Sequence, residues 1–506
     1  MSALGDAIDW ATNQGDEEVL KQADAVAESL IALAPDSPTA VDLAYFRANA
    51  WAALRYIHAP DNAWDREGLE AQGEILHLRE AAYHPAFGQI DPMRQCQIDT
   101  NLGNLLSHVG RFVDAVSCWD RAIARLPRFA MALGNRGYGL SFYARALYDP
   151  GHAGIMLLAA CDNLSAALHP DAIFDNPNQD DAIQGFANAR EEIAAHIHVD
   201  RVRELVKGLR GSETGSPQEA DYRRWCLNHR LFLNPLNDLG PLSVADHDVL
   251  TTPSFVGARD EPPSVLRFFN IMKQEYVSAR WMLYEGSTSD EVHFSDRGVL
   301  LYDTLDYQSH GLAIERVKST FRAAYSLFDK IGQFVNRYWR LGIDPNWVTL
   351  RRVWYKNPDK ETRALRPEFV GHENWPLRGL FWLSRDLIDP MPGFRRSTDP
   401  DARDIAAVRH RLEHGFLAVH EFEALFETLG SGLQQDGPFG KDPNLLAISR
   451  RALTAKALRL LQLARAALIY LSLAMHREEQ RRARERGTAA GIVPLDLGVV
   501  DDRWKR

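Results

Sequence analysis

Three residues in the last quarter of the chain carry side chains that can transfer protons and bind anions. Arg409, His410 and His414 lie within six positions, in the run Arg409-His410-Arg411-Leu412-Glu413-His414. A histidine titrates near neutrality and can therefore accept and donate protons under cellular conditions. A guanidinium is planar and always charged, so it can hold two oxygens of one anion. This run is the strongest candidate for chemistry in the sequence.

The same run has a second interpretation as a zinc site. His410, Glu413 and His414 spell H-x-x-E-H, the inverted zinc-peptidase motif, in which two histidines bind the metal and the glutamate acts as a base. Such a site needs a third ligand, and Glu478 and Glu479 are the candidates further along the chain. The residue types alone leave both interpretations open.

The apolar pattern around the run predicts a helix and orients the candidate residues on it. Val408 and Leu412 continue a core-facing stripe, so His410 and His414, one turn apart, point away from the core. Arg409 lies about 140° around the helix from His414 and must reach with its long side chain. The outward face continues through the weakly apolar positions Ala406, Ala407 and Leu417. Such a face predicts a partner, and a twofold dimer would bring two motifs together.

Apolar residues at steps of three and four predict four helices in the carboxyl-terminal part. Their expected ranges are 311–342, 375–388, 402–429 and 444–476. The last is apolar on nearly all sides, as expected for a buried helix. The helix at 402–429 contains the Arg409 motif, with Val419, Phe422, Phe426 and Leu429 as its later apolar positions. We therefore expect a four-helix bundle that carries the motif.

Two charged residues interrupt the apolar surroundings of the first of these helices. Asp329 and Lys330 stand within Phe328-Asp329-Lys330-Ile331-Gly332-Gln333-Phe334. We expect them to support the motif residues or to contact the substrate, and the alternative is an ion pair or a solvated flank. Asn374 directly precedes the second helix and fits a structural cap.

A helical repeat is recognisable in the amino-terminal half. Residues 100–129 resemble a tetratricopeptide (TPR) repeat, and Arg136, Gly137 and Leu140 begin a second copy 34 residues later. The positions that carry the resemblance are Leu102, Gly103, Leu106, Ala115, Trp119, Ala122 and Pro127. A single repeat cannot bury its own face, so we expect a solenoid of roughly three or four units over residues 15–190.

Longer segments connect the motif with a known family. The spacing of Arg409 and His414 resembles the R-x4-6-H pattern of the HEPN superfamily. Further runs, which together cover about residues 220–430, look like a bacterial HEPN family: YRRWCLNHRLFLNPLNDLG, FFNIMKQEYVSARWMLYEG, VHFSDRGVLLYDTLDY, FRAAYSLFDKIGQFVNRYW and LRGLFWLSRDL. This resemblance is much more specific than the short motif.

The resemblance implies a metal-independent endoribonuclease that acts as a dimer, as an antiviral defence effector or a toxin, without a cofactor. In such chemistry the ribose 2′-hydroxyl loses a proton as it attacks phosphorus, and the leaving 5′-oxygen gains one. His414 is then the candidate for proton transfer, His410 for supporting or sharing it, and Arg409 for holding the phosphate. The alternative within the family is a HEPN scaffold that binds RNA or a nucleotide without cutting it.

These patterns predict an all-α protein with a TPR-like solenoid followed by a HEPN four-helix bundle. We expect the TPR-like region at 1–200, a connector that packs between domains at 201–300, the bundle at 301–486 and a tail at 487–506. Glycine and proline recur over 208–264, which predicts the connector. The solenoid is the expected docking surface for an unknown protein partner or trigger.

Composition sets limits on the location and the partners of the protein. The amino terminus lacks the apolar stretch of a secretory signal, and Arg459 and Arg465 interrupt the most apolar stretch, so we expect a cytoplasmic protein without a membrane span. The net charge is −10, yet residues 403–486 hold 14 Lys+Arg against 10 Asp+Glu, which permits contact with RNA there. The four cysteines are widely spaced and predict structural thiols.

Overall fold

Helices make up most of the protein, and its few strands are short, which confirms the all-α class. The four cysteines are free and buried. The computed structural model describes residues 2–58, 68–175, 179–257, 263–358, 364–371, 373–388, 399, 401–421, 433–434, 436–437, 440–441, 444–487 and 494–505.

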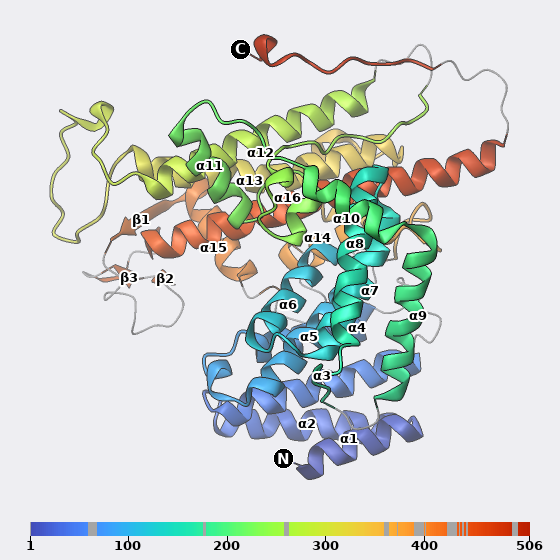
Figure 1. Cartoon of the computed structure of the whole chain (residues 1–506). Helices are drawn as coiled ribbons and strands as arrows, with labels where there is room; N and C mark the ends of the chain where they lie inside the picture. Colours follow the sequence, from blue (N-terminus) through green and yellow to red (C-terminus); the bar gives the residue numbers. More distant parts are fainter. Residues whose placement is uncertain are drawn as a thin grey trace.

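The amino-terminal helices stack on one another in chain order (Figure 1). Glycines allow this close packing, because a Cβ on Gly103 would lie 2.6 Å from the Trp119 ring, and one on Gly139 would lie 2.2 Å from it. The small-against-large packing at Gly103 is the one that the repeat pattern predicts. The helices are α1 (Ser2–Gln14), α2 (Glu17–Leu33), α3 (Pro38–His58), α4 (Gly68–Ala82), α5 (Pro92–His108), α6 (Phe112–Arg125), α7 (Ala130–Ala146), α8 (Pro150–Ala167) and α9 (Asp180–His196).

The segment after α9 contains α10 (Val199–Gly208) and α11 (Pro217–Asn228), followed by a stretch with only short 3-10 helices. This stretch is buried from Leu231 to Asp238. The Arg465 guanidinium donates to the carbonyl oxygens of Phe232 and Asn234 and to the Asp238 carboxylate. The segment therefore packs against α16.

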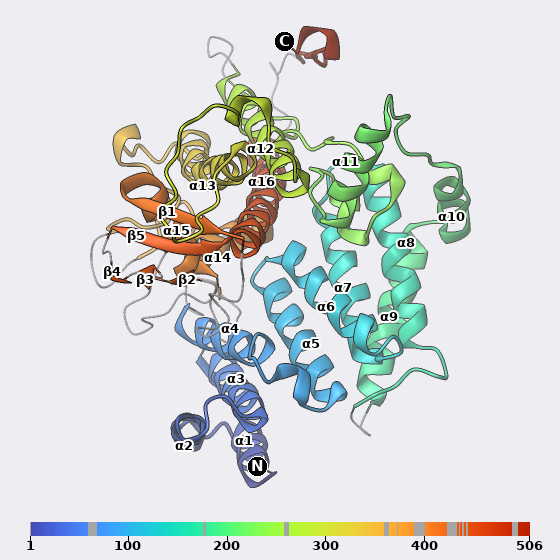
Figure 2. The ribbon, with the colours of Figure 1, turned by 90° about the vertical axis from the view of Figure 1, so that its left-hand side faces the viewer.

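The carboxyl-terminal helices pack around α16 (Arg450–Arg486). α16 is long and apolar enough to cross a membrane by composition, yet most of its apolar stretch is buried, as in the core helix of a soluble protein. Figure 2 shows α12, α13 and α15 gathered beside it. The helices around it are α12 (Ser264–Thr288), α13 (Leu312–Tyr338), α14 (Trp375–Ile388) and α15 (Ala402–His414).

α14 has the range that the sequence predicts, whereas the prediction of one helix over 402–429 is wrong. α15 ends at His414, and β1 (Phe416–His420) follows at once. β1 pairs in parallel with β5 (Leu445–Ser449), so the fourth helix begins at Arg450 and not at 444. Leu417 is buried in β1 and does not continue the outward face of α15. The predicted apolar positions Phe422, Phe426 and Leu429 lie outside the described residues.

Gly415 gives the physical reason for this change from helix to strand. Its backbone is extended, and a Cβ there would lie 3.0 Å from the Asn444 carbonyl oxygen. A strand that is buried on both faces is apolar at successive positions, and these positions also fit the spacing of a helix. Apolar periodicity therefore did not distinguish a strand from a helix over 416–420. The remaining strands are β2 (Leu433–Gln434), which pairs with β5, and β3 (Asp436–Gly437), which pairs with β4 (Gly440–Lys441).

A buried network of charges joins the amino-terminal helices to the bundle. Arg79 of α4 donates to the Asp386 carboxylate of α14 at 2.9 Å, and Arg111 binds the same carboxylate. Arg111 also donates to Asp114 at 2.9 Å, and Tyr470 of α16 donates to Asp114 at 3.1 Å. Arg79, Arg111 and Asp386 are all buried. These groups must stay paired, since a lone buried charge is costly.

We expect Asp386→Asn to destabilise the protein by about 3–5 kcal/mol, because two buried arginines lose the charge that they share. Urea denaturation followed by circular dichroism measures this loss. Asp200→Asn is the matched control, since the Asp200 side chain is fully exposed on α10. An unchanged urea midpoint for Asp386→Asn would show that the network does not stabilise this junction.

His108, at the end of α5, is a pH-sensitive group at the junction between the amino-terminal helices and the bundle. Its Nε2 lies 3.3 Å from an Arg378 nitrogen and 3.4 Å from an Arg55 nitrogen, so it accepts from guanidiniums only when it is unprotonated. Burial, assisted by Arg55 and opposed by Glu74, lowers the pKa of His108 to about 4. The folded protein therefore resists protonation at this position.

His108 predicts a loss of stability on acidification. An unfolded histidine binds a proton below pH of about 6.5, while folded His108 binds one only near pH 4, so the free energy of unfolding decreases as the pH falls between these values. The contribution is at most about 3 kcal/mol. His108→Gln should flatten this part of the stability–pH curve, measured by urea denaturation, whereas the exposed His169→Gln should follow the unmodified protein. Parallel curves for His108→Gln and the unmodified protein would contradict the assignment.

Candidate active site between α13 and α15

The Arg409 motif borders a pocket between α13 and α15. The pocket has a volume of about 260 Å³. Arg409, Glu413 and His414 border it from α15, and Tyr325 and Asp329 border it from α13. The other lining residues are Phe321, Arg322, Ser326 and Leu412. One chain therefore brings Arg409 and His414 to the same pocket, despite their separation of about 140° around α15.

Arg409 is held in place by the aromatic ring of Tyr325. Its guanidinium carbon lies 4.5 Å from the ring centroid, which is the geometry of a cation–π contact. A guanidinium that stacks on a ring keeps N–H groups along its edge for oxygen acceptors. Tyr325 and Asp329 are one helical turn apart and so present an aromatic face and a carboxyl to the same pocket.

Burial changes the proton affinity of both α13 residues. It raises the pKa of Asp329 above its ordinary value, and the positive charge of Arg409 opposes this rise. Burial also raises the pKa of Tyr325, again opposed by Arg409. A carboxyl with a raised pKa, beside a cation and in a pocket, is typical of sites that transfer protons.

His410 and His414 lie beside each other at the exposed end of α15. Their ring centroids are 5.4 Å apart, with an angle of 56° between the planes. Both side chains are exposed, as the helical pattern predicts, while Val408 and Leu412 are buried. His414 lines the pocket, and His410 lies next to it outside the lining. One imidazole thus borders the pocket, and a second lies beside it.

Arg322 fixes the end of α15 relative to α13. Its guanidinium donates to the Leu412 carbonyl oxygen at 2.9 Å, and it lies 3.5 Å from the Glu413 carboxylate. The last carbonyl groups of a helix lack partners within the helix, so this bond stabilises the turn that presents His414. Arg322 is a positioning residue that the motif did not reveal.

Asp329 and Lys330 point to different neighbours. Asp329 lines the pocket beside Arg409. The Lys330 ammonium forms an ion pair with Glu275 of α12 and is not among the residues that line the pocket. Asn374 acts as a cap, since its Oδ1 accepts from the Leu377 N–H and its Nδ2 donates to the Ala474 carbonyl.

The described residues contain no group of three or more His, Cys, Asp or Glu side chains that could hold a metal ion. Glu478 and Glu479 instead bind Arg481, Arg482 and Tyr338. They lie near the far end of α16, about 40 Å along the helix from Arg450, which follows the strand paired with β1. These glutamates cannot complete a zinc site with His410 and His414.

Comparison with known proteins agrees with this architecture. Residues 256–478, which include the pocket and the helices around α16, match the family model described as LA2681-like HEPN. The chain contains a HEPN domain. No curated protein and no solved structure gives a significant match.

The HEPN match includes α12 as well as the four regions that periodicity predicted. α12 packs along α13 and α16. Residue type and spacing in the sequence located the motif and Asp329, whereas Tyr325 falls among the apolar positions of α13 and has the character of a core residue. The spacing of Tyr325 and Asp329, four residues apart, was the available signal, because such residues share a helix face.

Proposed function

We propose that the HEPN domain is a metal-independent endoribonuclease whose active site is the pocket between α13 and α15. The observation that carries this proposal is the shared pocket of Arg409 and His414, with Tyr325 behind the guanidinium and Asp329 beside it. A permanent cation and an imidazole at one pocket are the groups that RNA cleavage through the 2′-hydroxyl requires.

In this mechanism His414 accepts the proton of the ribose 2′-hydroxyl as the oxygen attacks the adjacent phosphorus. The O2′–P bond forms while the P–O5′ bond breaks, and the leaving 5′-oxygen takes a proton from the protonated imidazole pair, with His410 sharing the transfer. The products are a 2′,3′-cyclic phosphate and a 5′-hydroxyl. This reaction requires neither a metal ion nor an oxidant.

Arg409 stabilises the charge that builds up on the phosphate oxygens. Its contact with Tyr325 restricts the guanidinium to one side of the pocket and lowers the entropy cost of binding the anion. Asp329 lines the pocket beside Arg409 and supports the guanidinium by its charge when ionised. Lys330 acts from outside the pocket, by holding α13 to α12 through Glu275.

The biological setting is a further part of this proposal. We propose a cytoplasmic defence effector or toxin that acts on RNA as a homodimer through its HEPN domain. The amino-terminal helices would dock an unknown protein partner or trigger. Tyr138 and Phe142 support this role, because both are partly exposed on α7 and stack with ring centroids 5.9 Å apart. Exposed aromatic side chains are typical anchors of protein interfaces.

Cleavage of labelled single-stranded RNA should persist in EDTA and decrease at least about 100-fold in both Arg409→Ala and His414→Ala. Gel analysis of initial rates measures this effect. Arg337→Ala and His169→Ala are matched controls, since Arg337 is exposed on α13 about 18 Å beyond Tyr325 and His169 is exposed after α8. Both controls should keep the full rate.

Each other outcome of this assay identifies a different function. RNA binding without cleavage, when expression of the protein is also harmless to cells, would support the HEPN scaffold. Peptide cleavage that EDTA abolishes would support the zinc peptidase. RNA cleavage that survives both Arg409→Ala and His414→Ala would contradict the proposed site.

Tyr325 offers a separate test of how Arg409 is positioned. Tyr325→Phe keeps the aromatic face and should retain the cleavage rate within about threefold, whereas Tyr325→Ala should reduce it about tenfold or more, because a cation–π contact is worth about 0.5–2 kcal/mol and fixes the guanidinium. Initial rates at saturating RNA and the KM separate positioning from binding. Equal rates for Tyr325→Phe and Tyr325→Ala would show that the ring does not position Arg409.

A further inference from the structure

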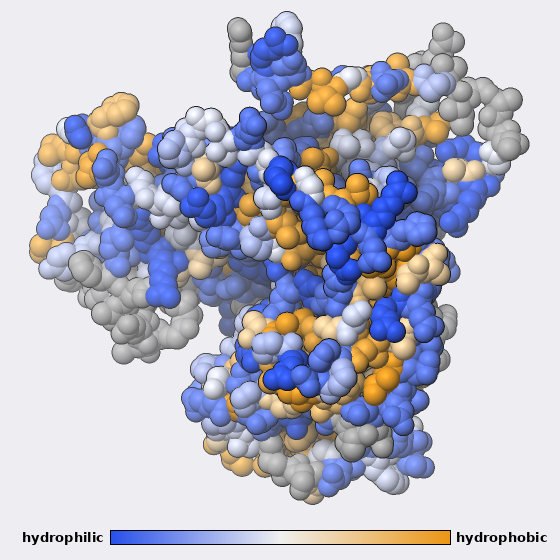
Figure 3. All heavy atoms as spheres, in the orientation of Figure 1, coloured by the Kyte–Doolittle hydropathy of each residue, from blue (hydrophilic) through white to orange (hydrophobic). Residues whose placement is uncertain are grey.

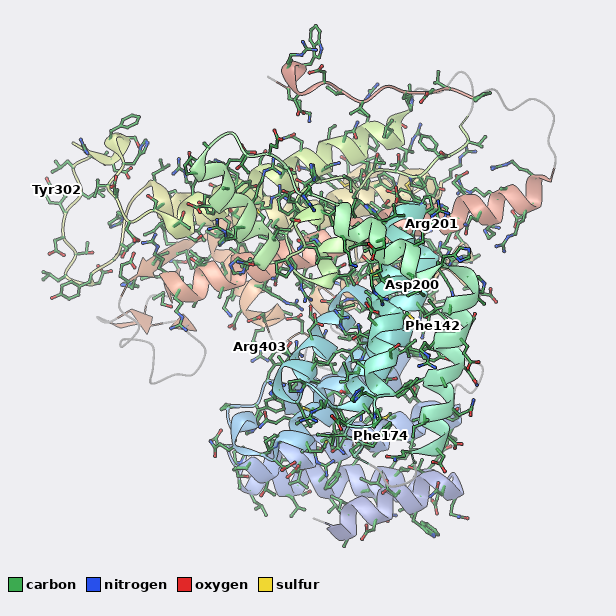
Figure 4. All side chains as sticks on the ribbon, viewed as in Figure 1. Phe142, Phe174, Asp200, Arg201, Tyr302 and Arg403 are labelled. Atoms are coloured by element: carbon green, nitrogen blue, oxygen red, sulfur yellow. The ribbon has the colours of Figure 1, made fainter. Side chains whose placement is uncertain are left out.

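The segment between α12 and α13 forms an apolar arm, defined here as residues 290–307, that projects from the bundle. In Figure 1 it leaves the end of the molecule that carries β1, and Figure 3 shows hydrophobic side chains on its surface. Tyr302 is labelled at its outer edge in Figure 4 and is 81% exposed. The large apolar residues of the arm that are more than half exposed are Val292, Phe294, Val299, Leu300, Leu301, Tyr302, Leu305 and Tyr307. Such a contiguous group marks an interaction site.

Hydrogen bonds hold the arm in a defined shape. The Leu305 N–H donates to Asp303 at 2.8 Å, and Thr304 donates to Asp306. At the base, the Ser309 N–H donates to the Val419 carbonyl of β1 at 2.7 Å. A preformed arm loses little entropy when it binds a partner.

The charge of the arm limits the kinds of partner that it fits. Residues 290–307 contain five Asp or Glu and a single Arg. This acidic surface would repel RNA and anionic lipid, even though aromatic side chains can stack on bases. The chemistry fits a protein surface that is basic and has small residues to receive the apolar side chains.

The outward face of α15 has these properties. At 100° per residue, Arg403, His410 and His414 lie on one stripe, with Ala406, Ala407 and Arg411 beside it. Arg403, Ala406 and both histidines are exposed, and neither Arg403 nor Arg411 forms an ion pair within the described part of the chain. Arg409 and Glu413 lie about 80–120° away from this stripe, toward the pocket. His414 belongs to both the stripe and the pocket lining, so a ligand on the stripe would border the pocket on the side of His414 while Arg409 and Asp329 face the pocket from the other side.

We infer that the arm of one copy docks on this α15 stripe of a second copy, and that the second copy returns the same contact. The inference deepens the homodimer of the proposed function by naming its surfaces. The arm and the stripe lie at the same end of the molecule, since the base of the arm binds β1 and β1 follows α15 directly. A twofold axis near β1 can therefore pair each arm with the other stripe.

The length of the arm and the surface area that it can bury are sufficient for the arm of each copy to dock on the stripe of the other. Tyr302 lies seven residues before the anchored Ser309, which allows a reach of up to about 23 Å. Each aromatic residue of the arm can bury about 150–250 Å². Two arms, together with the surfaces that they cover, would exceed the about 1,000 Å² that a specific interface needs.

Charge reversal tests the contact on the full-length protein by sedimentation velocity without RNA. Arg403→Asp/Arg411→Asp in one preparation and Asp290→Arg/Glu291→Arg in another should each raise the dimer dissociation constant at least tenfold, because both interfaces of the homodimer then oppose like charges; Asp290 and Glu291 are exposed arm residues. An equal mixture should restore dimerisation, since every arm in the mixed dimer meets a stripe of opposite charge. The double change Leu300→Ser/Tyr302→Ser should also weaken the dimer, while Leu495→Ser/Val499→Ser in the exposed tail should not.

A cross-linking measurement keeps the inference testable if a charge variant misfolds. The four native cysteines are buried, so an introduced thiol reacts selectively. A mixture of Tyr302→Cys and Ala406→Cys proteins should form a disulfide-linked dimer on mild oxidation, and Tyr302→Cys with Asp200→Cys should not. A monomeric protein, or a dimer that neither the arm nor the stripe variants weaken, would overturn the inference. RNA cleavage lost in Arg409→Ala would stand in either case, so the two proposals fail separately.

Discussion

α16 imposes the constraint on which the rest of the structure depends. It is a 37-residue helix whose apolar stretch is buried, yet it carries the buried Arg465 within that stretch and the partly exposed Arg459 before it. Arg459 lies 3.2 Å from the Asp399 carboxylate, and Arg465 binds Asp238 and two carbonyl oxygens. Because a buried cation without a partner costs several kcal/mol, the chain must wrap around this helix so that a carboxylate and carbonyl oxygens meet Arg465.

This wrapping also positions the candidate active site. α13 packs along α16, and the Lys456 ammonium of α16 lies 3.0 Å from Asp401 and 2.7 Å from Asp404 at the start of α15. The other end of α15 is fixed by β1, which pairs with the strand that leads into α16. Both ends of the motif helix are thus held to one rigid element. The pocket between α13 and α15 therefore has walls set by the core.

The parts of the fold that local patterns determine could be predicted from the sequence. The helix at 375–388 and the core stripe of α13 follow from apolar periodicity, and the outward direction of His410 and His414 follows from Val408 and Leu412. The strand after Gly415 could not be predicted, because its apolar residues also fit a helix. Its identity depends on a partner strand about 30 residues later.

Contacts between residues far apart in the sequence could not be predicted from local sequence patterns either. Arg79 and Asp386 are 307 positions apart, and no local pattern connects them. In the site, Arg409, His414 and Asp329 could be predicted from residue type and spacing. Tyr325 and Arg322 could not, because their roles depend on how α13 and α15 cross, which only the packing around α16 decides.

The central claim, cleavage of RNA through its own 2′-hydroxyl, is tested most directly by the chemistry of the products. Mass spectrometry identifies the ends of the fragments that are cut from a short RNA. The same RNA with a 2′-deoxy sugar at the cleaved nucleotide shows whether the 2′-hydroxyl is the attacking group. The account predicts 2′,3′-cyclic phosphate and 5′-hydroxyl ends, and no cleavage at the deoxy position. Fragments with 5′-phosphate and 3′-hydroxyl ends, or equal cleavage of the deoxy substrate, would contradict it.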